Sequence, residues 1–357
     1  MEDIGSLKKF WNKKKVFITG HTGFKGTWLC IILRYLNSTI YGYSLKPEKN
    51  SLFNKSKINK EIFSNKYSDV NNIEKLRKII KQSKAEIVFH LAAQPLVLES
   101  YKTPLKTFNT NIIGTLNILE CIREVKSVKS VVIITTDKVY KINKKNINYK
   151  ELDQLGGSDP YSASKVAAEV VVESYIKSFF KNTLLQNRIS TARSGNVIGG
   201  GDNSKNRLVP DIIRAINNKK KITIRNPKHV RPWQHVLDPL LGYLMLAKNQ
   251  YKNKINNNSS SWNFGPSKKN FKKVIDIIKY VKKLQYLNYK LLKNNKIKET
   301  MILKLNSTKA KKELNWISKW DLNMSIKKTI EWNILFKKGV SARDICEKQF
   351  LMYIKNK

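Results

Sequence analysis

Residues 19–26 read TGHTGFKG, and this short stretch decides the fold of the chain. The apolar run at 15–19 predicts a buried strand before it, and the apolar residues that follow, to about Leu36, predict a helix after it. In that context Gly20 permits a tight turn, Gly23 lets the backbone approach a phosphate, and Gly26 allows the helix to pack closely on the strand. The helix N-terminus would then face a pyrophosphate. We therefore expect a dinucleotide cofactor at this loop.

Strand and helix patterns alternate outward from this loop. Further strands are predicted at 39–44, 86–91, 130–136 and 184–192, and helices at about 72–82, 105–125 and 161–180. Residues 51–68 read as a polar connection. Alternation of this kind is typical of an α/β protein with a Rossmann-type, doubly wound parallel sheet.

The second half of the chain is more mixed. It predicts a short strand at 222–225 and helices near 208–217, 235–248, 270–284, 307–315, 323–337 and 342–355. We expect residues 1–192 to form the cofactor-binding Rossmann domain, with a return of the chain to it at 234–265. Residues 193–233 and 266–357 would form a smaller, mixed α/β domain that binds the substrate.

Composition excludes several classes of protein. A chain of 357 residues with 41% hydrophobic residues is typical of a globular enzyme, and neither a secretory leader nor a membrane-spanning run is visible. The three cysteines are widely spaced and lack metal-ligand spacing, so we expect reduced, buried thiols, no metal site and a cytoplasmic location.

The net charge of +43 is carried mainly by lysines scattered from end to end, which favours a solvated surface over nucleic-acid binding. Only ten of the 69 basic residues are arginine. Half of these fall within residues 193–231, and this concentration suggests bidentate recognition of phosphate. The five are Arg193, Arg207, Arg214, Arg225 and Arg231.

Two further segments carry acid–base chemistry. Tyr161 and Lys165 are spaced i,i+4 on one predicted helix face, where an ammonium would lower the phenol pKa and make Tyr161 a base. Thr136 ends the strand predicted at 130–136, and Asp137 and Lys138 follow it, where open α/β sheets place their chemistry. There Asp137 can serve as a general acid and Lys138 as a base.

These segments resemble the extended short-chain dehydrogenase/reductase superfamily, and within it the CDP-glucose 4,6-dehydratase family. The resemblance covers essentially the whole chain. It rests on HTGFKGTW at 21–28, ARSGNVIGGGD at 192–202, IRNP at 224–227, RPWQHVL at 231–237, and LNSTKA at 305–310 with LNW at 314–316.

The resemblance implies a three-step reaction with NAD held by the enzyme. Tyr161 would take the proton of the sugar 4-hydroxyl as hydride leaves C4, with Thr136 hydrogen-bonded to that hydroxyl. Water would then leave across C5 and C6, with Asp137 protonating the 6-hydroxyl, before hydride returns to C6. Lys138 would either remove the C5 proton or stabilise the enolate. The product would be CDP-4-dehydro-6-deoxy-D-glucose, a precursor of the deoxysugars of surface polysaccharides such as the O-antigen.

The resemblance also implies binding residues. Along NAD it places Gly20, Thr22, Gly23, Phe24, Lys25, Gly26, Asp69, Val70, Leu91, Ala92, Ala93, Gln94, Thr110, Tyr161 and Lys165. Near CDP-glucose it places Asn196, Arg207, Arg231 and His235, although structural packing explains His235 equally well. Ser44 stands where NAD-specific proteins often have an acid, which leaves NAD or NADP open. A homodimer or dimer of dimers, paired through helices 105–125 and 161–180, is the superfamily arrangement.

Three alternatives remain. Asn203-Ser204 and Asn206 depart from the family pattern, so another nucleotide-glucose is an alternative substrate. A nucleotide-sugar 4-epimerase would need Tyr161 and Lys165 but no pair that expels water. A catalytically silent binding module should lack part of the catalytic set, all of which is present.

Overall fold

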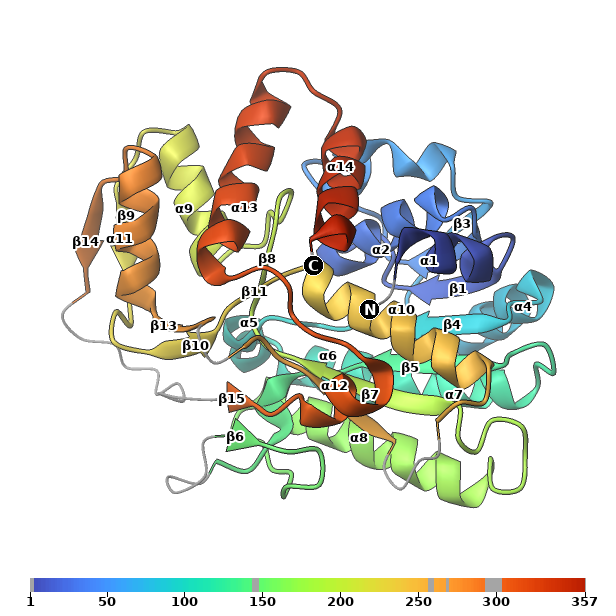
Figure 1. Cartoon of the computed structure of the whole chain (residues 1–357). Coiled ribbons are helices and arrows are strands. Elements are labelled where there is room, and N and C mark those ends of the chain that lie inside the picture. Colours follow the sequence, from blue (N-terminus) through green and yellow to red (C-terminus); the bar gives the residue numbers. More distant parts are fainter. Residues whose placement is uncertain (1–2, 143–147, 256–259, 268–269, 293–303, 357) are drawn as a thin grey trace.

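A parallel β-sheet forms the centre of the molecule. The computed structural model describes residues 3–142, 148–255, 260–267, 270–292 and 304–356 (Figure 1). Within these residues, seven strands pair in the order β12-β7-β5-β4-β1-β2-β3, each pair parallel. Their bounds are β1 Lys15–Thr19, β2 Thr39–Ser44, β3 Ser64–Tyr67, β4 Ile87–His90, β5 Ser130–Ile134, β7 Ile189–Ser194 and β12 Ser261–Phe264. The predicted doubly wound α/β class is confirmed.

The strand order reverses at β1. From β1 the chain first proceeds outward through β2 and β3, and then crosses to β4 on the other side. Ligands of open α/β sheets bind at such a switch point, beyond the carboxyl ends of the strands. The glycine loop at 20–23 and the segment after β4 both lie there.

Alternating side chains send the strands' apolar residues to opposite faces of the sheet. Val16 and Ile18 belong to a core with α2 (Phe24–Tyr35) and α10 (Leu237–Tyr251), joined by α1 (Ile4–Trp11) and α14 (Ala342–Lys355). Phe17 belongs to the opposite core, with α4 (Ile73–Ser83), α7 (Gly114–Arg123) and α8 (Pro160–Ser178). Cys30, Cys121 and Cys346 are buried and free, as predicted. In the described part of the chain, no helix has the length and apolar character needed to cross a membrane.

A third core lies outside the sheet. Residues of α9 (Leu208–Asn217), α11 (Val274–Leu284) and α13 (Leu322–Lys337) pack together around Ile212, Ile277 and Ile326. Short strands flank them (Figure 1). These pair as β8 (Val197–Ile198) with β11 (Gln234–His235), β9 (Ile222–Ile224) with β14 (Tyr289–Leu291), and β10 (Val230–Pro232) with β13 (Phe271–Lys273). Between these elements the chain contributes α10 and β12 to the sheet region, whereas the two-domain division itself stays a prediction.

The remaining elements connect these layers. They are α3 (Leu52–Ser56), η1 (Ile58–Lys60), α5 (Val97–Lys102), η3 (Asp137–Val139), β6 (Asn148–Tyr149), β15 (Lys304–Leu305) and α12 (Thr308–Leu314). β6 pairs with β15.

Two local predictions are wrong, and a third is confirmed with a modification. Residues 51–68 contain α3 and the edge strand β3, and the sequence gives no strand signal for β3 because its side chains are polar and only partly buried. The helix expected at 105–125 is present, but a π-helical segment (Asn109–Ile113) lies between α6 (Pro104–Phe108) and α7. The strand expected from residue 184 begins at Ile189, after a turn.

Candidate active site

The glycine loop is built as the sequence predicts. Gly20 has φ +72°, and a Cβ there would lie 2.6 Å from the Ala92 amide nitrogen. Gly23 is the N-cap of α2, and a Cβ on Gly26 would lie 2.2 Å from the Gly20 carbonyl oxygen. The Gly20 turn therefore packs directly against the backbone of Ala92, and α2 begins beside it, which is the arrangement of a loop that binds a pyrophosphate at a helix N-terminus. These residues fit a dinucleotide cofactor.

The neighbouring loops lie beside this glycine loop. The Thr22 hydroxyl bonds the Ser44 hydroxyl at 2.8 Å and the Leu45 carbonyl at 3.0 Å, so the end of β2 is polar but carries no acid. Asp69 and Val70 follow β3. The Asp69 carboxylate accepts from the Asn71 amide at 2.9 Å, and Val70 is buried against Gly114.

The segment after β4 bonds to the end of β1. The Leu91 amide donates to the Thr19 carbonyl at 3.1 Å, and the Ala92 amide to the Thr19 hydroxyl at 3.2 Å. Ala93 follows, and the Gln94 side chain bonds within its own loop. Thr110 lies on the π-helical segment.

Asn111 on the π-helical segment is a residue that sequence reasoning missed. Its buried amide joins the Gln94 backbone to the Ser164 hydroxyl. It thereby links the segment after β4 to α8. A buried amide in an apolar helix was the available signal.

Thr136, Asp137 and Lys138 meet Tyr161 at the carboxyl end of β5. The Thr136 hydroxyl donates to the Asp137 carboxylate at 3.1 Å, and, in opposition to burial, its proximity to the Tyr161 phenol lowers the pKa of that group. Asp137 is buried, and Lys138 is partly exposed. Burial raises the pKa of the Asp137 carboxyl, although the nearby Lys138 charge opposes this. A carboxyl with a raised pKa is suited to donate a proton.

Tyr161 and Lys165 share one face of α8, and both are buried. The expected lowering of the phenol pKa is not found. Burial raises the pKa of Tyr161 to about 12, and it lowers that of Lys165 to about 8. The Lys165 ammonium donates to the Ile134 carbonyl at 3.2 Å, and desolvation is the largest cause of both pKa shifts.

The Lys25 side chain extends from the glycine loop to Ser194 of β7. Its ammonium donates to the Ser194 hydroxyl at 2.7 Å, and that hydroxyl bonds Tyr243 at 2.9 Å. Burial, followed by the charge of Arg207, lowers the pKa of Lys25 to about 7. Ser194 and Tyr243 were also missed, because only the fold brings β7 and α10 to this loop.

The residues predicted for the substrate come from separate elements. Asn196 lies between β7 and β8. Arg207 caps α9 and lies 3.7 Å from the Asp202 carboxylate, with a third of its side chain exposed. Arg231 on β10 is nearly buried and contributes positive charge at Asp137. The structure therefore brings Arg231 to the acid–base residues.

The structure places His235 in the core. The residue is fully buried, its ring lies 4.8 Å from that of Trp320 and 5.9 Å from that of Trp28, and burial lowers its pKa to about 3. The packing interpretation is therefore the one that the geometry supports.

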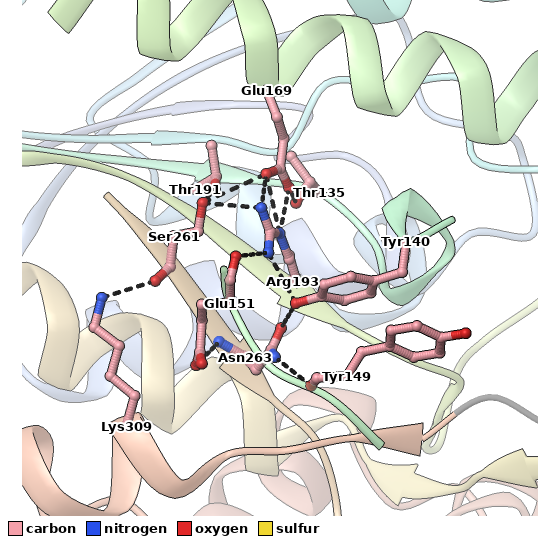
Figure 2. Close-up of polar contacts among 10 residues, drawn as sticks. All are labelled: Thr135, Tyr140, Tyr149, Glu151, Glu169, Thr191, Arg193, Ser261, Asn263 and Lys309. Carbon is pink, nitrogen blue, oxygen red and sulfur yellow. Dashed lines mark hydrogen bonds and ion pairs between the residues drawn. The ribbon is translucent and has the colours of Figure 1, made fainter. Parts of the chain in front are cut away.

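The phosphate interpretation is wrong for Arg193. Its guanidinium forms a buried ion pair with Glu169 of α8 and donates to the Tyr140 hydroxyl at 2.8 Å (Figure 2). Arg214 is likewise engaged, with Asp211 and the Asn203 carbonyl. Arginines that are close together in the sequence therefore have different structural roles.

The fold and this arrangement define a nucleotide-sugar-modifying enzyme of the short-chain dehydrogenase/reductase type. Residues 17–329 match the family model described as GDP-mannose 4,6 dehydratase, and the chain belongs to that family. Within it, the chain is 40% identical to the CDP-glucose 4,6-dehydratase of Salmonella typhimurium over 348 residues, which are 96% of both chains.

Solved structures share the fold at lower identity. The dTDP-glucose 4,6-dehydratase of Bacillus anthracis, in complex with NAD, superposes with a TM-score of 0.75 at 20% identity, covering 91% of this chain and 98% of the other. The UDP-glucose 4-epimerase of Stenotrophomonas maltophila, with bound NAD, has a TM-score of 0.77 at 17% identity, covering 92% and 100%. These likenesses confirm the fold.

Proposed function

We propose that this protein is an NAD-dependent CDP-glucose 4,6-dehydratase, a hydro-lyase that converts CDP-D-glucose to CDP-4-dehydro-6-deoxy-D-glucose and water. The observation that carries the proposal is the end-to-end 40% identity to a CDP-glucose 4,6-dehydratase. The grouping of Thr136, Asp137 and Tyr161 supports it, because elimination of water needs an acid beside the oxidation site.

The chain's own residues then have separate tasks. Tyr161 accepts the proton of the 4-hydroxyl, and the Thr136 hydroxyl holds that group by a hydrogen bond. Asp137, buried and with a raised pKa, gives its proton to the departing 6-hydroxyl. Lys138 acts at C5, as the base or as the cation that stabilises the enolate.

In this proposal the glycine loop and the α2 N-terminus bind the pyrophosphate of NAD, and Asp69 contacts the adenine. NAD, when bound, supplies the hydride acceptor. Asn196, Arg207 and Arg231 bind the diphosphate of the substrate in this proposal. Arginine suits this task because its guanidinium can donate two parallel hydrogen bonds to a phosphate group.

The test is incubation of the purified protein and NAD with CDP-glucose, dTDP-glucose and UDP-glucose separately, followed by mass spectrometry. Loss of one water from CDP-glucose is the expected result. Dehydration of dTDP-glucose or UDP-glucose alone would support the dehydratase reaction but contradict cytosine as the nucleobase of the substrate. An isomer of unchanged mass would instead establish 4-epimerisation.

We also propose that the protein forms a homodimer through α6, α7 and α8. Exposed apolar side chains on or beside these elements support this, because exposed apolar patches mark contacts. Leu105 lies on α6, Ile113 ends the π-helical segment before α7, Val170 lies on α8, and Phe179 follows α8. The three unpaired, buried cysteines support a cytoplasmic location.

A further inference from the structure

The buried carboxylate of Glu169 lies on the same helix as the proposed catalytic residues Tyr161 and Lys165. Glu169 follows Tyr161 and Lys165 on α8 at i+8 and i+4, so all three lie on one face of the helix. The side chain of Glu169 is 3% exposed, and that of its ion-pair partner Arg193 is 2% exposed. Removing two charges from water this completely is costly unless both are fully bonded.

Both members are fully bonded (Figure 2). The Glu169 carboxylate accepts from the Thr135 hydroxyl at 2.6 Å and from Arg193 Nε at 2.9 Å and 3.0 Å. Arg193 also donates to the Tyr140 hydroxyl at 2.8 Å, to the Glu151 carbonyl at 2.9 Å and to the Ser261 hydroxyl at 3.0 Å. The Tyr140 hydroxyl in turn donates to Asn263 at 2.7 Å.

These contacts lie beside the proposed site residues in sequence. Thr135 immediately precedes Thr136, Arg193 lies three residues before Asn196, and Tyr140 follows Lys138 by two. A single carboxylate therefore joins the end of β5 and the end of β7 to the helix that carries Tyr161.

Electrostatics give Glu169 a second task. Of the charged or titratable groups that face Lys165 in the described part of the chain, Glu169 favours the ammonium, whereas Lys25 and His90 do not. Because burial already lowers the pKa of Lys165 to about 8, loss of the Glu169 charge would lower this pKa further and decrease the fraction of the ammonium form at neutral pH.

We propose that Glu169, held by Arg193 and Thr135, is a positioning residue that keeps Lys165 in its ammonium form and fixes α8 against the end of β5. The catalytic half of this inference rests on the role proposed above for Tyr161 as the base, and on the expectation from the sequence that a neighbouring Lys165 ammonium supports that role. The positioning half concerns the protein alone.

The test measures Lys165 directly. Protein made with isotope-labelled lysine is titrated by NMR, and the Lys165 signal is assigned with Lys165→Arg. In Glu169→Gln, which keeps the size of the side chain but removes its charge, we expect Lys165 to lose its proton about one pH unit lower than in the wild type. In the same variant, the alkaline limb of the kcat profile with CDP-glucose should move down equally, with KM little changed.

Glu173→Gln is the matched control. Glu173 lies on the same helix, one turn further along, but its side chain is 59% exposed and pairs with the exposed Lys177. We expect this variant to titrate and turn over like the wild type.

A second variant is needed in case Glu169→Gln does not fold, because this substitution leaves Arg193 as an unpaired buried charge. Glu169→Gln/Arg193→Gln removes both charges, and the Lys165 shift should persist in it. An unchanged Lys165 titration in either folded variant would overturn the inference. Absence of dehydration by the wild-type enzyme would instead reject the proposed function, and the NMR titration would still decide the role of Glu169.

Discussion

The Asp137 carboxylate lies 2.8 Å from the point that a Cβ atom on Gly195 would occupy. That point is also 2.7 Å from the Pro232 ring, so neither neighbour leaves room for a methyl group. The proposed acid therefore owes its place to the absence of a side chain in the connection between β7 and β8.

Gly195→Ala should consequently push Asp137 out of position. We expect the rate of dehydration to fall by about 100-fold, the scale on which a positioned general acid contributes. Formation of bound reduced nicotinamide on mixing with CDP-glucose should persist, because Tyr161 is untouched. Gly5→Ala, on α1, is the control and should behave like the wild type. Dehydration at the wild-type rate by Gly195→Ala would contradict this assignment of Asp137.

Lys138→Ala separates oxidation from elimination. If Lys138 acts at C5, the variant should reduce the bound cofactor on addition of CDP-glucose but release little dehydrated product. Absorbance of the reduced nicotinamide measures the oxidation at C4, and mass spectrometry of the sugar measures the elimination of water. Full turnover by Lys138→Ala would show that another group acts at C5.

Gly26→Ala should damage the cofactor loop. A methyl group 2.2 Å from the Gly20 carbonyl must displace the α2 N-terminus, and overpacking of this kind costs about 1–3 kcal/mol of stability. NAD titration of the folded protein should show much weaker binding. Gly23→Ala, whose Cβ would be 3.3 Å from the same carbonyl, should have the smaller effect. Equal NAD affinity in Gly26→Ala and the wild type would be inconsistent with a pyrophosphate at this loop.

Three buried histidines should make the fold sensitive to mild acid. Burial lowers the pKa of His21 to about 4 and those of His90 and His235 to about 3, below the ordinary value of 6.5. Between these values the unfolded chain binds more protons than the folded one, so stability falls as pH decreases below about 6.5. Each histidine should contribute about 1.4 kcal/mol of loss between about pH 7.5 and 5.5.

Chemical unfolding at the two pH values checks this expectation. His90→Gln should be less stable at neutral pH, because His90 bonds the Thr19 hydroxyl at 2.7 Å. It should nevertheless lose less stability on acidification than the wild type. An identical loss in both proteins would mean that His90 is not the titrating group.

A cation on α8 should break the proposed dimer. Val170 is 56% exposed, and Val170→Lys would place a charge in the apolar contact. Sedimentation should show a monomer for this variant and a dimer for the wild type. Phe63→Lys changes a more exposed apolar residue, beside the opposite edge strand β3, and should leave the dimer intact. A monomeric wild-type protein would contradict the proposed homodimer.

Much of the site was predictable because its signals are local. The glycine spacing, the Tyr161–Lys165 pair and the buried strand before Thr136 each lie within a few residues, and all of them meet at one edge of the sheet. The edge strand β3 was missed because polar, partly buried residues carry no period-two hydrophobic signal. Arg193 was misread because its partner Glu169 is 24 residues away on another element.

By itself, then, the sequence determined the doubly wound sheet, the cofactor loop and the chemistry of the acid–base residues, since backbone conformation and hydrophobic periodicity are written in neighbouring residues. Only the tertiary structure decided which polar side chains share a desolvated space. It set Lys25 against Ser194, buried His235 between tryptophans, gave Asp137 the room left by Gly195, and placed Glu169 behind Lys165. Burial and charge proximity depend on distances in space, and these set the protonation states on which the proposed reaction depends.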